Sequence, residues 1–461
     1  LLCCNNSSVT GATTGTVTSS GDPTASSDSP FDDPAGFKFG DAGDQNVIKC
    51  GSYTTDSNED ATVDLGWEPQ WLLVKRTDSS GDWNLIDSMR GFPNAQDIQA
   101  NASGQCIVLE PNTTDEDDNT TRYGITPTGF YADQFGANRS YVYCAIRRPD
   151  GYCGKPPELG TGVFAMDTGN GSTDGPAFDS GFPVDMGLRR LPASGNSGTP
   201  NTDWATYTRL LGGVFLRTNT TAATQSSTRA KFDFNDGFNH TDDSTYQAWM
   251  WKRHAGFDVV CWEGDDTNAF RRHNLAKIPE MIWFKNRDDT RSWRVYHKGL
   301  NGGTNPEDYA IALNSSSAEG SNTSYMNGTA PTSTHFVAGL DGDTNVSGDS
   351  YIALLFSSVP KISAVGSYTG NASSTARNFN LGFQPRFIII KGATNTAWWQ
   401  VLDTTRGWGP GNDELIWLND SAAQMNFNTD WGAPTSTGFT FSTTDNKFNQ
   451  NNINYIYYAH A

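Results

Sequence analysis

One short pattern occurs four times along this chain, and this repetition limits the possible folds more than any other feature. In each copy a Pro precedes a strongly apolar run that ends on a basic residue six positions after the Pro. The four copies of this first marker are 65–75, 181–189, 275–285 and 381–391. A fixed internal spacing that recurs at a constant period is the sequence signature of repeated structural units. The chain is therefore predicted to be a tandem array of small domains.

Two further markers recur in the same order. The closing marker is an apolar segment that begins at a tyrosine, and the tyrosines follow one another at intervals of 104 or 105 residues: Tyr141, Tyr246, Tyr351 and Tyr455. Between the first and closing markers each copy carries a phenylalanine, preceded by Gly in three copies and by His in the third: Phe130, Phe238, Phe336 and Phe439. These markers place unit one at 47–148, unit two at 160–253, unit three at 257–358 and unit four at 361–461.

An aromatic segment follows the first marker in every unit, at 82–87, 203–207, 292–297 and 398–403. Units one and four continue it as Asp-x-x-Arg-Gly, whereas unit two is degraded and carries an insertion between Pro183 and Trp204. The Asp87/Arg90 and Asp403/Arg406 pairs could be a catalytic acid with an anion-holding group. A local salt-bridged turn is favoured, because exposed pairs close in sequence are common and contribute little stability. Unit two is expected to be a structural spacer.

The pattern inside one unit predicts an all-β fold. Short apolar runs rich in Ile, Val, Leu and aromatic residues alternate with Gly, Ser and Asn turns, and no helical periodicity of useful length is present. Pro69 and Pro385 stand at strand entrances, where a missing N–H group does least harm. We expect four tandem β-sandwiches of jelly-roll type, with the first-marker and tyrosine strands central and buried.

Residues 1–46 differ from the rest of the chain. They are rich in Ser, Thr, Gly, Asp and Pro, which is the composition of a linker, and they begin at Leu1 rather than Met, so the start is processed or incomplete. We expect an extended docking arm anchored by Phe31, Phe37 and Phe39. Because such an arm cannot fold alone, it is expected to make the contacts of a homo-oligomer, with a trimer as the guess from analogy with fibres.

The charge balance excludes two classes of partner. With 51 acidic and 32 basic residues, the net charge of −19 disfavours nucleic acid and anionic membranes. No apolar stretch approaches the roughly 18 residues that a membrane helix requires. The remaining partners are other proteins, other copies of the chain and neutral surfaces such as host polysaccharide.

Motifs for catalysis or metal binding are weak. The seven cysteines form no framework, the six histidines have no ligand spacing, and no nucleophile elbow or phosphate-binding loop occurs in its required context. Asp341 and Asp343 alternate as in a calcium loop, but the Gly and Glu that such a loop needs are missing, so calcium stays open. The chain is expected to be no enzyme and to hold no cofactor or metal.

Exposed aromatic rings are the remaining candidates for a binding site. Trp398, Trp399 and Trp83 occupy the aromatic segment and could stack on sugar rings. The competing interpretation is that recurrent strand tryptophans belong to the core.

The combination of markers resembles a repeat domain of uncharacterised structural proteins from marine tailed phages of the cyanophage type. The resemblance rests on the Gly-Phe-x-Pro segment, the following Trp and Asp-x-x-Arg-Gly, the later Gly-Phe step and the tyrosine strand, and it covers the chain outside the arm. It implies a virion structural protein, either a tail fibre or an appendage subunit that takes part in host attachment, and it carries no catalytic residues. The alternatives are a carbohydrate-binding adhesin and an extracellular cell-surface filament subunit. A polysaccharide-degrading enzyme is the least favoured.

Overall fold

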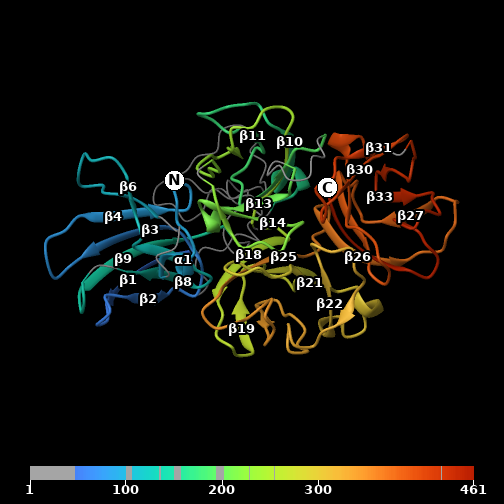
Figure 1. Cartoon of the computed structure of the whole chain (residues 1–461). Helices are drawn as coiled ribbons and strands as arrows, with labels where there is room; N and C mark the ends of the chain where they lie inside the picture. Colours follow the sequence, from blue (N-terminus) through green and yellow to red (C-terminus); the bar gives the residue numbers. More distant parts are fainter. Residues whose placement is uncertain are drawn as a thin grey trace, which may run out of the picture.

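The computed structural model describes residues 47–99, 106–133, 136–149, 157–193, 202–227, 229–253, 255–426 and 428–461. These residues form an almost purely β structure, as predicted (Figure 1). No helix in these ranges has both the length and the apolar character needed to cross a membrane. Residues 1–46, with the proposed anchors Phe31, Phe37 and Phe39, lie outside the described part of the chain.

Each of the four expected ranges contains one six-stranded antiparallel sheet with the same strand order. In unit one the order along the sheet is β1 (Ile48–Thr54), β9 (Ser140–Arg147), β3 (Pro69–Arg76), β4 (Trp83–Asp87), β5 (Cys106–Leu109) and β6 (Asp118–Thr120). In unit two it is β10 (Phe164–Thr168), β17 (Gln247–Trp251), β12 (Met186–Arg190), β13 (Ala205–Thr208), β14 (Val214–Arg217) and β15 (Gln225–Ser226). In unit three it is β18 (Phe257–Glu263), β25 (Ser350–Phe356), β20 (Met281–Asn286), β21 (Arg294–His297), β22 (Tyr309–Ala312) and β23 (Gly320–Ser321). In unit four it is β26 (Ser363–Thr369), β34 (Asn454–His460), β28 (Phe387–Gly392), β29 (Gln400–Asp403), β30 (Glu414–Trp417) and β31 (Met425–Asn426).

A smaller sheet packs on one face of each large sheet and completes the sandwich. The small sheets are β2 (Ala61–Asp64) with β8 (Gly129–Ala132) and β7 (Tyr123–Thr126), β11 (Phe178–Asp179) with β16 (Gly237–Phe238), β19 (Ala269–Arg272) with β24 (His335–Ala338), and β27 (Arg377–Asn380) with β33 (Gly438–Phe441) and β32 (Pro434–Thr435). The sandwich prediction is confirmed, with strands divided unequally between the two sheets.

In the described part of the chain, helical structure is confined to short segments between strands. They are the helix α1 (Ala95–Gln99) and the 3₁₀ turns η2 (Gly160–Gly162), η3 (Arg209–Leu211), η4 (Leu300–Gly303), η5 (Pro306–Asp308) and η6 (Thr404–Arg406).

The sequence markers coincide with the central elements of each sandwich. The first-marker and tyrosine strands lie next to each other in the middle of the sheet, as β3 with β9 and β28 with β34. The marker phenylalanines on the small sheets are fully buried in all four units. The Gly before three of them has a steric reason, because a Cβ atom at Gly129 or Gly438 would meet the carbonyl oxygen of the partner strand within 2 Å.

One alignment made from the sequence is wrong by one residue. In unit two Arg190, rather than Arg189, faces the position after the marker tyrosine, since it pairs with Gln247 as Lys285 pairs with Ile352. The strand enters one residue later in unit two, so the spacing from Pro183 misassigned the basic residue. Lys75, Arg190, Lys285 and Lys391 are therefore the equivalent residues.

The face of each large sheet that points away from its small sheet is here called the outer face. In units two, three and four the outer faces pack against one another, and their apolar residues belong to a single shared core. Both faces of these strands are buried, which explains why apolar residues occupy consecutive positions before the basic residue instead of alternate ones.

Equivalent tryptophans join these three units into a closed cycle. The indole Nε1 of Trp204 in unit two donates to the Trp417 carbonyl of unit four at 2.6 Å. Trp399 of unit four donates to the Ala312 carbonyl of unit three at 3.0 Å. Trp293 of unit three closes the cycle on the Arg217 carbonyl of unit two at 2.8 Å.

The equivalent basic residues repeat the same cycle. Arg190 donates to the Ser421 carbonyl at 2.9 Å, Lys391 to the Ser316 carbonyl at 3.0 Å, and Lys285 to the Thr221 carbonyl at 3.1 Å. Each acceptor lies two residues after an asparagine that caps its own unit's Trp N–H group, namely Asn419, Asn314 or Asn219.

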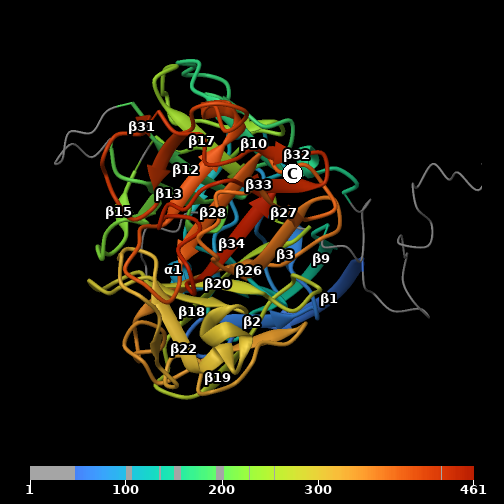
Figure 2. The same ribbon diagram turned by 90° about the vertical axis from the view of Figure 1, so that its right-hand side faces the viewer.

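A backbone bond completes each junction. The N–H groups of Thr224, Glu319 and Gln424 donate to the carbonyls of Arg287, Ala393 and Pro192 at 2.7 to 2.8 Å. Three equivalent contacts that close on themselves define an approximate threefold arrangement, which is the geometry of a cyclic trimer of separate chains. Units two, three and four are called the ring below (Figure 2).

Unit one joins the ring by the end of its sandwich. Glu68, just before β3, accepts from both terminal nitrogens of Arg253 at 2.8 and 2.6 Å, and Asp97 in α1 pairs with Arg287 at 2.7 Å. Burial favours a neutral Asp258, but Arg253 and Arg148 beside it outweigh burial and keep its pKa below the usual range. The end-on contact leaves the outer face of unit one outside the shared core.

The two Asp-x-x-Arg-Gly segments are local salt-bridged turns, as predicted. Asp87 and Arg90 are joined at 2.8 Å, and Asp403 and Arg406 at 2.7 Å. The expectation that both are exposed is wrong for unit four. There the pair is buried in the ring, and the Asp403 carboxylate also accepts from the Trp249 indole of unit two at 3.0 Å.

Candidate functional site

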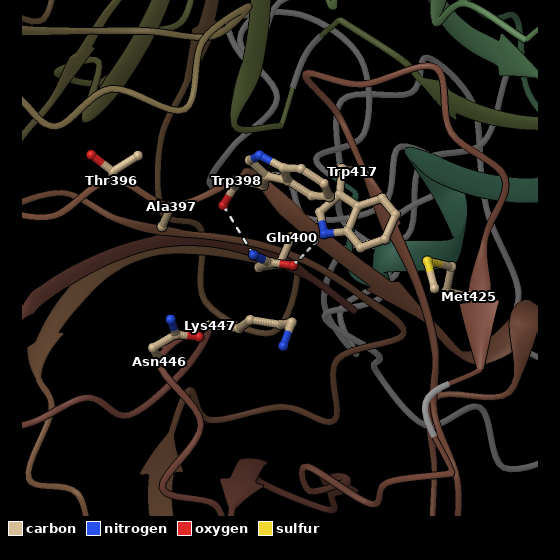
Figure 3. A pocket seen from close by; sticks show the side chains of 8 residues that line it. All are labelled: Thr396, Ala397, Trp398, Gln400, Trp417, Met425, Asn446 and Lys447. Atoms are coloured by element: carbon tan, nitrogen blue, oxygen red, sulfur yellow. Dashed lines mark hydrogen bonds between the residues drawn. The ribbon is translucent and has the colours of Figure 1, made fainter. Parts of the chain in front are cut away.

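The groove with the clearest binding chemistry lies at one end of the unit-four sandwich. It encloses about 390 Å³ and is open to solvent on one side. Figure 3 shows its lining: Thr396, Ala397, Trp398, Gln400, Trp417, Met425, Asn446 and Lys447. A volume of this order suits a small ligand, since pockets for small molecules start at roughly 300 Å³.

Two tryptophans form the apolar wall of this groove. The rings of Trp398 and Trp417 meet edge to face, with centroids 4.5 Å apart and planes at 82°. Gln400 fixes both of them, because its amide donates to the Trp398 carbonyl at 3.2 Å and accepts from the Trp417 indole at 2.8 Å (Figure 3). Trp398 is 40% exposed to solvent, which is high for a tryptophan side chain in this structure.

Comparison with the other units indicates that these tryptophans are not required by the fold. The position of Trp398 is occupied by Asp82, Asp203 and Ser292 in units one, two and three. The position of Trp417 is occupied by Glu110, Arg217 and Ala312, as the strand pairing shows. In units one and two the aspartate accepts from the capping asparagine at 2.7 Å. Of the four units, only unit four carries an aromatic ring at both positions.

The opposite side of the groove is polar. Lys447 pairs with Asp445 at 3.0 Å, and its ammonium lies 5.8 Å from the centre of the Trp431 ring. Asn446 adds an amide that can donate and accept. An exposed ring face opposite amide and ammonium donors is an arrangement suited to a sugar, which has an apolar face and a rim of hydroxyl groups.

The three tryptophans named from the sequence are placed in three different environments. Trp398 lines the groove. Trp399 is 2% exposed and is bonded into the ring, so its candidacy as a glycan-facing residue is corrected. Trp83 is 38% exposed but lies on unit one, far along the chain from the groove and on the outer face of its sheet.

Sequence reasoning missed Trp417 and the capping asparagines. Trp417 gave no signal because it falls in a strand whose other copies carry unrelated residues. The asparagines do recur after that strand, as Asn112, Asn219, Asn314 and Asn419, each followed by Thr, Ser or Asp. Their spacing could have served as a further marker.

The calcium loop suggested by Asp341 and Asp343 is occupied by protein groups. Asp343 pairs with Arg294, and Asp341 accepts from the Asn322 amide at 2.8 Å and from the Asp343 N–H group at 2.8 Å. Within the described ranges, no three His, Cys, Asp or Glu side chains converge as a metal site would require.

Comparison with known proteins places the chain in one family. No curated protein matches it. The family described as "Domain of unknown function (DUF7483)" matches residues 36–146 and 213–461. The match takes in nearly all of unit one, part of unit two and all of units three and four, which is more than half of the sequence. The chain therefore belongs to the DUF7483 family.

Proposed function

We propose that this protein is a structural subunit of a phage virion, as part of a fibre or appendage. The observation that carries the proposal is the ring, in which three sandwiches of one chain imitate a cyclic trimer. Its buried tryptophans and cations bond to backbone carbonyls of the neighbouring unit. Such contacts join the three units into a rigid body. The side chains that make them are buried in the junctions and are used for structure. A rigid body of this kind suits a structural part that holds other virion proteins in position in the assembled particle.

Labelling of particles tests this proposal. Antibodies raised against the purified chain are applied to purified particles of the phage whose genome encodes it, and the gold label is located by electron microscopy. Label on the tail or its appendages is the expected result. Label on the surface of uninfected cells, with none on particles, contradicts the proposal and supports a cell-surface filament or adhesin.

A second function, carbohydrate binding, is favoured by the groove in unit four. Only unit four has tryptophan at both the Trp398 and Trp417 positions. The partly exposed Trp398 ring lines a groove of about 390 Å³ together with Asn446 and Lys447. Host surface polysaccharide is the proposed ligand, which would make unit four the host-facing end.

Glycan binding is tested with a pair of variants. Trp398→Ala removes the exposed ring. Loss of an aromatic side chain that anchors a ligand typically lowers the affinity by about tenfold or more. Phe270→Ala is the control, because Phe270 is equally aromatic, 64% exposed and located in unit three. Binding of the wild-type chain to a glycan array, lost in Trp398→Ala and kept in Phe270→Ala, supports the function. Equal binding by both variants, or by neither wild type nor variant, contradicts it.

A further inference from the structure

The outer face of unit one has the composition of an interface but lies outside the shared core. Its strands carry apolar residues at alternating positions, the arrangement that in the ring is buried: Ile48, Leu73, Trp83, Leu85, Val142 and Ile146. Ile48, Trp83 and Val142 are 50%, 38% and 38% exposed. The residues that occupy the Val142 position in the ring, Gln247, Ile352 and Ile456, are exposed by 3% or less.

Unit one also keeps the polar groups that join the ring units. Lys75 and Trp83 correspond to the cations and tryptophans that donate across each junction, and they face each other on β3 and β4. Lys75 is only half-buried, and the carbonyls it reaches, those of Arg76 and Gly81, belong to its own unit. The capping asparagine is present as well, since Asn112 accepts from the Trp83 N–H group at 2.8 Å. The Glu110 and Thr114 carbonyls thereby occupy the places of the ring's acceptors.

From this correspondence we infer that unit one is the contact by which three copies of the chain associate, outer face to outer face, in the geometry of the ring. In that assembly Trp83 of one copy donates to the Glu110 carbonyl of the next, and Lys75 donates to the Thr114 carbonyl. The number three follows from the ring, where equivalent contacts close after three units. The inference does not depend on the proposed virion role.

Charge favours a second copy as the occupant of this face. The acceptor loop of unit one is acidic at Asp115, Glu116, Asp117 and Asp118, whereas the acceptor loop of unit two, residues 219–224, has no charged residue. In a ring of three unit-one domains this loop would meet Lys75 of the neighbouring copy, which stands on the outer face opposite Trp83 and Val142. Opposite charges across the rim of an interface speed association and disfavour other partners.

The first test measures the mass of the full chain in solution by size-exclusion chromatography with light scattering. Wild type is expected at three times the chain mass. Val142→Arg places a charge at a position that is already partly exposed, so the unit still folds, and it is expected to weaken association by at least about tenfold. Phe270→Arg, an exposed aromatic position in unit three, is expected to leave the trimer unchanged.

The second test is a cross-link designed from the ring. Thr77 and Asp117 correspond to the residue pairs that are joined by backbone bonds of 2.7 to 2.8 Å at each ring junction. Thr77→Cys combined with Asp117→Cys, treated with a short bis-maleimide, is expected to give covalent trimers. Either single variant is expected to give no covalent trimer beyond the wild-type background.

Three results would overturn the inference. One is a wild-type chain that stays monomeric at about 100 μM, because the affinity between copies would then be too weak for a specific interface. Another is a trimer that Val142→Arg does not weaken. The third is a monomeric chain in which Val142→Arg makes residues 1–46 newly sensitive to trypsin, because the chain's own terminal segment would then occupy the face.

Discussion

Units one and four are the two copies most alike in sequence, yet the outer face of unit four is buried and that of unit one is partly exposed. Both carry the Trp segment, Asp-x-x-Arg-Gly and an apolar tyrosine strand. In unit four every residue of β28 is buried, whereas in β3 of unit one every second residue is partly exposed from Leu72 to Lys75. The side chains of Asp403 and Arg406 are 0% and 4% exposed, and those of Asp87 and Arg90 are 20% and 24% exposed.

This difference shows that one sandwich design serves two purposes. Alternate apolar residues facing the small sheet are enough to hold a unit together. A single sandwich does not need the second apolar face to fold. That face contributes to stability only when neighbouring units cover it and remove it from water. Substitutions at equivalent positions in the ring and in unit one should therefore differ in their effect on stability.

The largest effect is expected from the equivalent tryptophans. Trp399→Ala removes a buried ring and its bond to the Ala312 carbonyl, and a core Trp→Ala change costs about 3–5 kcal/mol of unfolding free energy. Trp83→Ala in unit one should cost less than about 1 kcal/mol in the isolated chain, because Trp83 is partly exposed. Denaturant unfolding of both variants at low protein concentration measures the contrast. Equal losses would mean that the two faces do not differ as described.

Acidification should weaken the ring before it affects unit one, which contains no histidine. Burial lowers the pKa of His297 to about 4, and its neutral ring donates from Nε2 to the Tyr457 carbonyl of unit four. The unfolded chain takes up this proton near pH 6.5, whereas the folded chain resists until about pH 4. Stability is therefore full above pH 6.5 and is lost as the pH falls toward 4, by up to about 3 kcal/mol for this group.

The measurement is the free energy of unfolding at pH 7 and pH 4.5 for wild type and His297→Gln. The variant should lose less stability than wild type over this interval. His335→Gln, in β24 of the small sheet of unit three, serves as the control for removal of a histidine outside the contact with unit four. A slope that His297→Gln leaves unchanged would assign the acid sensitivity to other groups.

A smaller contrast is expected from the basic residues. Burial lowers the pKa of Lys391 to about 7. Lys391→Met would take the side-chain donor from the Ala397 carbonyl and would leave the Ser316 carbonyl with the Ala397 N–H group as its donor, at a cost of about 1–3 kcal/mol. Lys75→Met should change the stability of the isolated chain by less than about 0.5 kcal/mol, since Lys75 is half-buried and its carbonyl partners can bond to water. Thermal unfolding at neutral pH compares the two. A stabilised Lys391→Met chain would show that desolvation of the charge outweighs its bonds.

Much of one unit could be predicted from the sequence because its determinants are local. The Phe130 and Phe439 positions, the central place of the strand after Pro385 and the Asp403–Arg406 turn all follow from short patterns that act within one sandwich. The candidate groove was predictable only in part. Trp398 was named, but its partner Trp417 comes from a strand that pairs across the sheet, and no local pattern marks that neighbour.

By itself the sequence determined the repetition, the β-sandwich class and the residues that form each unit's interior, since the periodicity of apolar residues fixes which side chains share a face. Only the tertiary structure decided which of the equivalent outer faces are covered. Trp399 and Trp83 stand in nearly the same local sequence, and one is buried while the other is exposed. The physical reason is that burial of a second sheet face depends on neighbours distant along the chain, and no short segment encodes their position.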